Sequence, residues 1–130
     1  MKPKSNKYKH REVTEKIIGA FYNVYNALGY GFLEKVYENA LLFELNEKGM
    51  DAKQQMAIKV HYKGNLIGEY FADIVVNNKV IVEIKATEEL HEKHTLQLIN
   101  YLKATDFEVG LLLNFGEKPK VVRKIFTNQN

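Results

Sequence analysis

The segment 71–86, FADIVVNNKVIVEIKA, most constrains the fold of this 130-residue chain. Two runs of β-branched residues flank an Asn-Asn pair, which predicts two short strands joined by a tight turn. Nearly unbroken Val and Ile are typical of strands covered on both faces, where a charged side chain is costly unless it pairs or binds a metal. Because Asp73, Glu83 and Lys85 interrupt this apolar hairpin, the segment predicts a polar site within the sheet.

The length of the turn decides whether Asp73 joins the other two charged residues. Side chains alternate along a strand, so Glu83 and Lys85 point to the same face. With a two-residue turn, Asp73 would lie opposite Val82 and point away from Glu83. With Lys79 also in the turn, or with a bulge, Asp73 lies opposite Glu83 instead.

We predict the second register, because it gathers two carboxylates and an ammonium group. Such a set suits a hard divalent cation and the phosphate charge that the cation would serve. A surface hairpin with a solvated salt bridge is the alternative that spacing alone leaves open.

The composition is that of an ordinary globular protein, with 45% hydrophobic and 27% charged residues. We expect a single domain over 11–130 that follows a basic, flexible tail over 1–10. No apolar run has the length of a membrane span and no signal-peptide pattern opens the chain, so we expect a cytoplasmic protein with no membrane partner. The lack of cysteine excludes disulfides, thiolate zinc sites and a cysteine nucleophile.

Positive charge gathers at the two ends of the chain, although the net charge is only +3. Basic ends are compatible with contacts to a phosphate backbone, and a solvated or disordered terminus explains them equally well. The candidate nucleic-acid-binding residues near the N-terminus are Lys2, Lys4, Lys7, Lys9 and Arg11.

Hydrophobic periodicity predicts the remaining elements. In chain order they are helices over about 12–28 and 32–48, strands over about 56–62 and 66–76, the second strand of the central hairpin, a helix ending near residue 103, and a strand over 109–114. Gly68 marks a bulge or bend, and 121–126 is an edge strand or a short helix. This order predicts a mixed sheet flanked by helices.

Two of the predicted helices carry further candidate residues. Glu34 lies near the start of the second helix, with Glu38 one turn further along. The helix dipole favours a carboxylate there, so Glu34 also has a purely structural explanation. On the third helix, Gln97 and Tyr101 are one turn apart and can form a hydrogen bond.

With these elements placed, the chain resembles the PD-(D/E)XK nuclease superfamily and, within it, the small group of GxxExxY proteins. The namesake motif stands here as GFLEKVY over 31–37. The superfamily core order αβββαβ matches the predicted order over 32–114, with an extra helix before it. The resemblance implies an α/β, restriction-endonuclease-like fold, with a three-layer α/β/α core around a mixed central sheet.

The motif residues match one at a time. Asp73 matches the motif aspartate of the second strand, and EIK at 83–85 matches the (D/E)-x-K of the third. Glu34 resembles the acidic residue that many members carry on the first core helix. Gln97 resembles the glutamine of a helix motif in resolvase-like and exonuclease-like branches. The proline that often precedes the motif aspartate is replaced here by Ala72.

The resemblance implies metal-dependent hydrolysis of phosphodiester bonds. The implied ligands of Mg²⁺ or Mn²⁺ are Asp73, Glu83, the backbone carbonyl of Ile84 and, as an outer or second-metal ligand, Glu34. Lys85 would orient or help to deprotonate the attacking water and stabilise the transition state. Gln97 would position the water or a phosphate oxygen.

We predict a metal-dependent nuclease whose expected substrate is DNA in a branched, nicked or single-stranded form. Because the chain carries little basic surface, we expect it to act as a homodimer or with a partner. The alternative is a catalytically silent module that keeps the fold and binds nucleic acid or protein. Other chemistry lacks support, since the four histidines show no HExxH spacing and no Gly-rich phosphate loop occurs.

Overall fold

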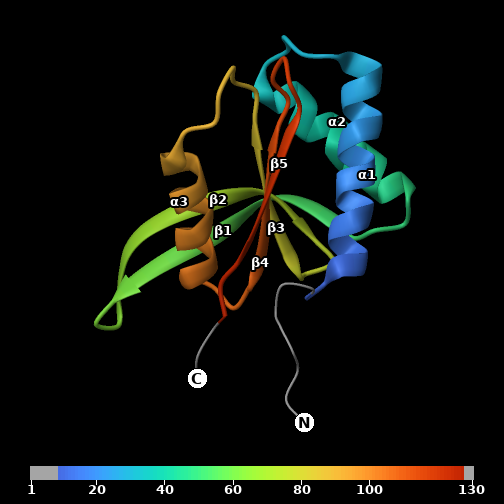
Figure 1. Ribbon diagram of the computed structural model, residues 1–130. Helices are drawn as coiled ribbons and strands as arrows, with labels where there is room; N and C mark the ends of the chain where they lie inside the picture. Colours follow the sequence, from blue (N-terminus) through green and yellow to red (C-terminus); the bar gives the residue numbers. More distant parts are fainter. Residues whose placement is uncertain (1–8, 128–130) are drawn as a thin grey trace.

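The computed structural model describes residues 9–127 (Figure 1). Its elements are α1 (Arg11–Leu28), α2 (Glu34–Glu47), β1 (Ala52–Tyr62), β2 (Asn65–Val76), β3 (Val80–Lys85), α3 (Glu92–Lys103), β4 (Val109–Asn114) and β5 (Lys120–Ile125). Most of the predicted tail over 1–10 lies outside the described residues. Among the described helices, none combines the length and apolar character that crossing a membrane requires.

The strands form one mixed sheet in the order β1-β2-β3-β4-β5. All neighbouring pairs are antiparallel except β3 and β4, which run parallel and are connected through α3. The last element, left open between strand and helix, is the edge strand β5. The predicted α/β fold with a mixed central sheet is therefore confirmed.

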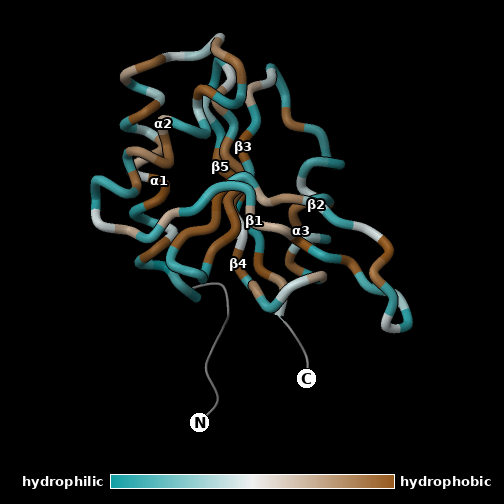
Figure 2. The backbone as a smooth tube through the Cα atoms, turned by 180° about the vertical axis from the view of Figure 1, so that it is seen from behind, coloured by the Kyte–Doolittle hydropathy of each residue, from teal (hydrophilic) through white to brown (hydrophobic). Residues whose placement is uncertain are grey.

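Helices cover both faces of the sheet, so that the molecule has three layers (Figure 1). On the face of α1 and α2, a core cluster includes Phe21, Leu41 and Val82. On the face of α3, a second cluster includes Ile81 and Leu98. The strands in the middle of the sheet are accordingly the hydrophobic part of the chain in Figure 2, as their Val and Ile content predicts.

The β1–β2 hairpin changes its orientation as it leaves the central sheet. Ile74 packs in the core of α1 and α2, whereas Ala72 packs in the core of α3. Residues two apart in a regular strand share a face, so β2 switches faces between them. In β1, Ala52 and Met56 show the same change, and Gln55 between them has a left-handed φ of 57°.

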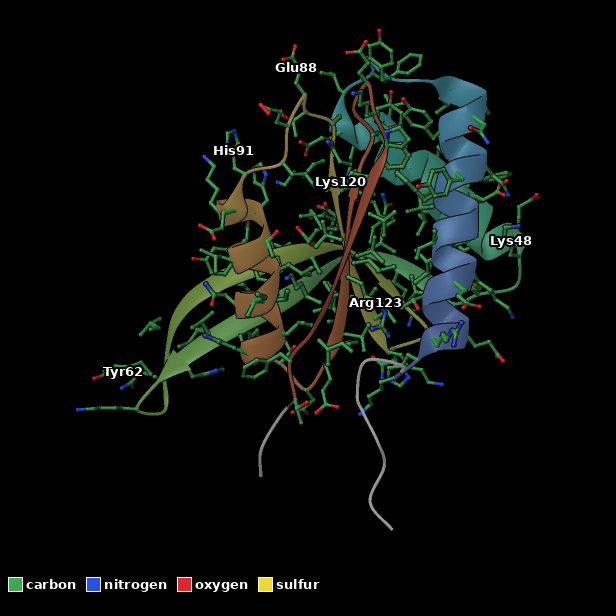
Figure 3. All side chains as sticks on the ribbon, in the orientation of Figure 1. Lys48, Tyr62, Glu88, His91, Lys120 and Arg123 are labelled. Carbon is green, nitrogen blue, oxygen red and sulfur yellow. The ribbon has the colours of Figure 1, made fainter. Side chains whose placement is uncertain are left out.

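Beyond this kink, the outer half of the hairpin projects past α3 (Figure 1). The register shifts between Val60 and His61, where Gly68 lies opposite Val60, so the predicted bulge at Gly68 is confirmed. The hairpin ends in an exposed turn beside Tyr62, which is labelled in Figure 3.

A buried tyrosine fixes the connection between α1 and α2. The hydroxyl of Tyr37 donates to the carbonyl of Gly29 at 2.6 Å and accepts from the backbone N–H of Phe32 at 3.2 Å. Its ring stacks on Phe115, with centroids 4.4 Å apart. Gly31 has a φ of 112°, which glycine adopts without strain. The observed α2 begins at Glu34, later than the predicted residue 32.

Candidate active site

The turn between β2 and β3 sets the two motif carboxylates opposite each other. Ile74 pairs with Val82, so the next position along the ladder places Asp73 opposite Glu83. Lys79 belongs to the turn, and the two asparagines before it adopt left-handed φ values of 53° and 52°, which asparagine tolerates better than most residues. The predicted register is confirmed.

Each carboxylate also bonds to the backbone of the opposite strand. The N–H of Asp73 donates to Oε2 of Glu83 at 2.9 Å, and the N–H of Ile84 donates to Oδ2 of Asp73 at 2.8 Å. The regular pairing of β2 with β3 extends only to Ile74. Beyond that residue, these side-chain hydrogen bonds connect the two strands. Within the described chain, the second oxygen of each carboxylate accepts no hydrogen bond, which leaves one oxygen on each for a ligand.

Burial of this carboxylate pair disfavours its full ionisation. Glu83 is only 7% exposed, and burial, followed by the charge of Asp73, raises the pKa of Glu83 to about 8. Burial likewise raises the pKa of Asp73, although the Ile84 N–H opposes that shift. A cation between the two would remove the repulsion and stabilise both ionised forms.

The donor set fits a magnesium-type cation better than a zinc ion. Mg²⁺ binds through one or two carboxylates and keeps several waters, whereas zinc takes a fuller set of nitrogen and sulfur ligands. Over residues 9–127, no three His, Cys, Asp or Glu side chains group closely enough to form a complete metal site. Asp73 and Glu83, with water and the carbonyl of Ile84, therefore supply the type and number of ligands that Mg²⁺ or Mn²⁺ accepts.

Lys85 ends β3 beside the carboxylates and faces α3. Its positive charge lowers the pKa of both Asp73 and Glu83, and after burial it is the largest influence that lowers the pKa of His94 on α3. Among the described residues Lys85 forms no ion pair, so its ammonium group is available to an incoming anion. His94 itself caps α3, because its Nδ1 accepts the backbone N–H of His91 at 3.2 Å.

Two glutamates of α2 differ in their relation to this site. Glu34, the predicted outer ligand, is exposed in the first turn of α2. Glu38 is 5% exposed. The charge of Glu38 raises the pKa of Asp73 more than the charge of Glu34 does. Oε2 of Glu38 accepts hydrogen bonds from Lys35 at 3.1 Å, and from two amides of β1 at 2.9 and 3.0 Å.

The sequence places Glu38 one turn after Glu34 but does not predict that Glu38 is buried against β1. One of the two amides that it binds belongs to Gln55, the residue in the left-handed conformation, which lies opposite Asp73 along the β1–β2 register. A strained backbone of this kind persists only where its surroundings hold it. The sequence signal that could have indicated Glu38 is its place directly after the buried Tyr37, on the inner side of α2.

Gln97 and Tyr101 approach the site from α3. The amide of Gln97 donates to the hydroxyl of Tyr101 at 2.6 Å, so their predicted contact is confirmed. Burial, followed by the charge of Glu83, raises the pKa of Tyr101. The pair therefore lies on the α3 side of the carboxylates, and the Tyr101 ring is 5.6 Å from that of Tyr70 on the hairpin.

The basic N-terminal residues that the structure describes are occupied elsewhere. Lys9 forms an ion pair with Glu108, and Arg11 pairs with Glu15 at 2.7 Å. Lys9 also lines a small pocket with Lys79, which places it at the turn end of β3, away from Lys85. The other three candidates, Lys2, Lys4 and Lys7, lie outside the described residues.

Comparison with known proteins agrees with the fold. A family model described as the PD-(D/E)XK nuclease superfamily matches residues 11–125. The crystal structure of SSO0001 has a similar fold, with a TM-score of 0.60 and 20% identity, over 95% of this chain and 62% of that chain. This chain thus spans less than two thirds of that protein, and the likeness concerns the fold alone. A search of curated proteins found no match.

Proposed function

This chain belongs to the PD-(D/E)XK nuclease superfamily, and from that premise we propose that it is a metal-dependent nuclease that hydrolyses phosphodiester bonds in DNA. The observation that carries the proposal is the buried pair of Asp73 and Glu83, each with one oxygen free. The pKa of Glu83 is about 8, so its ionised form destabilises the folded protein unless a cation or a proton is bound at the site.

Within this proposal, the two carboxylates are positioned before any substrate arrives. Asp73 and Glu83 would hold Mg²⁺ or Mn²⁺ with their free oxygens, and the carbonyl of Ile84 would assist. The bound ion would acidify water and neutralise charge on the phosphate. Because backbone N–H groups fix the other oxygen of each carboxylate, little reorganisation accompanies binding.

The remaining roles belong to side chains on β3, α3 and α2. Lys85 orients the attacking water and stabilises negative charge on the phosphate in the transition state. Gln97 donates one N–H to Tyr101, which leaves its carbonyl oxygen and second N–H to position the water or a phosphate oxygen. Glu34, exposed at the start of α2, acts as an outer ligand or binds a second cation.

The finer assignment to the GxxExxY group is supported by the way the motif is used. Gly31 and Tyr37 build the connection that begins α2, and Glu34 at the start of that helix lies close enough to Asp73 for its charge to raise the pKa of Asp73. We also propose that the active form is a homodimer, since a second copy would double the basic surface available to DNA.

Cleavage assays with a lysine pair test the proposed function. Lys85→Ala should lower Mg²⁺-dependent cleavage of nicked, branched and single-stranded DNA by at least about 100-fold, the usual effect of removing one transition-state donor. Lys53→Ala removes an exposed lysine of β1 and serves as the matched control, with unchanged cleavage. A fully active Lys85→Ala protein contradicts the assigned role.

Calorimetric titration with Mg²⁺ and Mn²⁺, with and without a short DNA duplex, tests the metal site itself. The unmodified protein and Lys85→Ala should bind metal, and the double variant Asp73→Asn/Glu83→Gln should not. If the unmodified protein binds neither metal in either condition, the nuclease proposal fails and the silent binding module becomes the better hypothesis.

A further inference from the structure

An open groove runs between α3 and the outer half of the β1–β2 hairpin. Its volume is about 870 Å³, and it exists because the kink at Gln55 carries the hairpin out past α3 (Figure 1). One wall is formed by hairpin residues such as Ile67 and Tyr70, and the other by a face of α3 that includes Leu96.

The groove borders the candidate active site through two residues of α3. Gln97 and Tyr101 line the α3 wall, and the same two residues lie on the α3 side of the carboxylates. Tyr101 lies between the groove and the carboxylates. Its ring is 5.6 Å from the ring of Tyr70, and it is close enough to Glu83 for that charge to raise the pKa of Tyr101. A ligand in the groove would therefore contact the two α3 side chains that lie beside the carboxylate pair.

The walls expose apolar and aromatic surface that the core does not use. Ile67 is 63%, Tyr70 50% and Leu96 52% exposed. Isolated exposed apolar residues are ordinary, but several that converge on one concave surface are typical of a binding site.

Positive charge accompanies this surface. Lys93 and Lys103 line the groove at the two ends of α3, and no Asp or Glu is found among its lining residues in the described chain. The ammonium group of Lys103 also lies 5.9 Å from the ring of Phe126. Lys59 also lines the hairpin wall, but it lies opposite the negatively charged Glu69 in the ladder. The positive charge assigned to the groove is therefore that of the two α3 lysines.

This combination matches an unpaired nucleic-acid strand better than a duplex. A duplex presents phosphates outward and hides its bases, so it would use the lysines and leave the apolar walls bare. A single strand offers phosphates to lysine and base faces to aromatic and apolar side chains at the same time. Acidic apolar peptides share part of this chemistry and are an outcome of the test below.

We propose that this groove binds a single-stranded segment of nucleic acid, with a base stacked on Tyr70 and phosphates at Lys93 and Lys103, and guides it toward Asp73 and Glu83. The proposal rests on the proposed nuclease function and names its substrate as a strand that is unpaired beside the cleaved bond.

Fluorescence anisotropy in EDTA measures this binding without cleavage. The probes are a labelled short oligothymidylate, an oligouridylate of the same length, and a DNA duplex of that length. We expect the single strands to bind more tightly than the duplex. Tyr70→Leu, which keeps an apolar side chain and loses the aromatic face, should weaken single-strand binding by about tenfold, whereas Tyr70→Phe should bind as the unmodified protein does.

The two α3 lysines are tested by the salt dependence of binding. Lys93→Gln/Lys103→Gln should reduce the slope of log affinity against log salt by about 1.4, because a phosphate contact on a single strand contributes about 0.7. The control Lys16→Gln/Lys120→Gln removes two exposed lysines of α1 and β5 and should leave the slope unchanged.

Three results would overturn the proposal: duplex binding as tight as single-strand binding, equal affinities of Tyr70→Leu and Tyr70→Phe, or equal salt slopes of the two lysine pairs. Direct binding of a labelled poly-glutamate peptide that depends on Tyr70, without single-strand binding, would likewise assign the groove to a protein partner. Failure of the proposed function can be distinguished from failure of the groove proposal. If the protein binds single strands through Tyr70 but never cleaves them with Mg²⁺, the groove proposal stands and the nuclease proposal fails.

Discussion

The buried carboxylate of Glu83 predicts that the metal-free protein loses stability as pH rises. In the unfolded chain Glu83 ionises with a pKa of 4.5, whereas burial and the charge of Asp73 raise the native pKa to about 8. Between these values the native state holds a proton that the unfolded state has released. The contribution of Glu83 is therefore complete below pH 4.5 and is lost as the pH rises to about 8.

The magnitude follows from the linkage between protons and folding. A difference of about one bound proton lowers the free energy of unfolding by about 1.4 kcal/mol per pH unit, so roughly 2–3 kcal/mol is lost between pH 5 and pH 7. Glu83 is only 7% exposed, so solvent screens this effect weakly. Glu83→Gln resembles the protonated side chain in shape, and its amide oxygen can still accept the N–H of Asp73.

Urea unfolding, followed by circular dichroism in EDTA at a series of pH values, measures the effect. The two proteins should have similar stability near pH 5, and the unmodified protein should fall below Glu83→Gln as pH rises. Other titrating groups, including His94, are common to both proteins, so they largely cancel in the difference. Added Mg²⁺ should restore the unmodified protein near pH 8 and leave Glu83→Gln unchanged. Parallel stability curves for the two proteins would refute the assignment of a raised pKa to Glu83.

Three further substitutions test the surroundings of the site. Glu38→Ala removes the acceptor that holds the Gln55 amide, and should lower the free energy of unfolding by about 1–3 kcal/mol and speed amide hydrogen exchange in the outer hairpin; unchanged exchange there would contradict the role of Glu38. Tyr37→Phe removes both hydrogen bonds of the buried hydroxyl and should cost about 1–3 kcal/mol in urea unfolding; a cost near zero would mean that the aromatic stack alone holds the turn. Gly116→Ala would bring a Cβ within 2.3 Å of a backbone oxygen in the β3–α3 connection and should lower the melting temperature, whereas the control Gly19→Ala, with nothing within 4 Å, should raise it.

The sequence predicts most of the fold because its strongest signals are local. The Val and Ile runs of the central hairpin indicate strands covered on both faces, and β3 contributes to both cores. The requirement that Asp73 meet Glu83 selects the register with Lys79 in the turn, and the observed pairing agrees. Side-chain alternation along two adjacent strands is enough to bring these residues together.

What the sequence does not predict depends on contacts between distant elements. The left-handed conformation of Gln55 has no local signal, because glutamine carries no preference for it. The buried position of Glu38, and the two β1 amides that it binds, depend on how α2 packs against β1. The groove depends in turn on the direction that the kinked hairpin takes.

The crossed hydrogen bonds of Asp73 and Glu83 make the candidate metal site depend on the pairing of β2 with β3. Each carboxylate is held by the backbone of the opposite strand, so the ligand pair exists only while β2 and β3 are joined. A nascent or partly unfolded chain holds the same residues without this arrangement. Under the proposed function, the chain would therefore acquire its activity only with the assembly of the sheet.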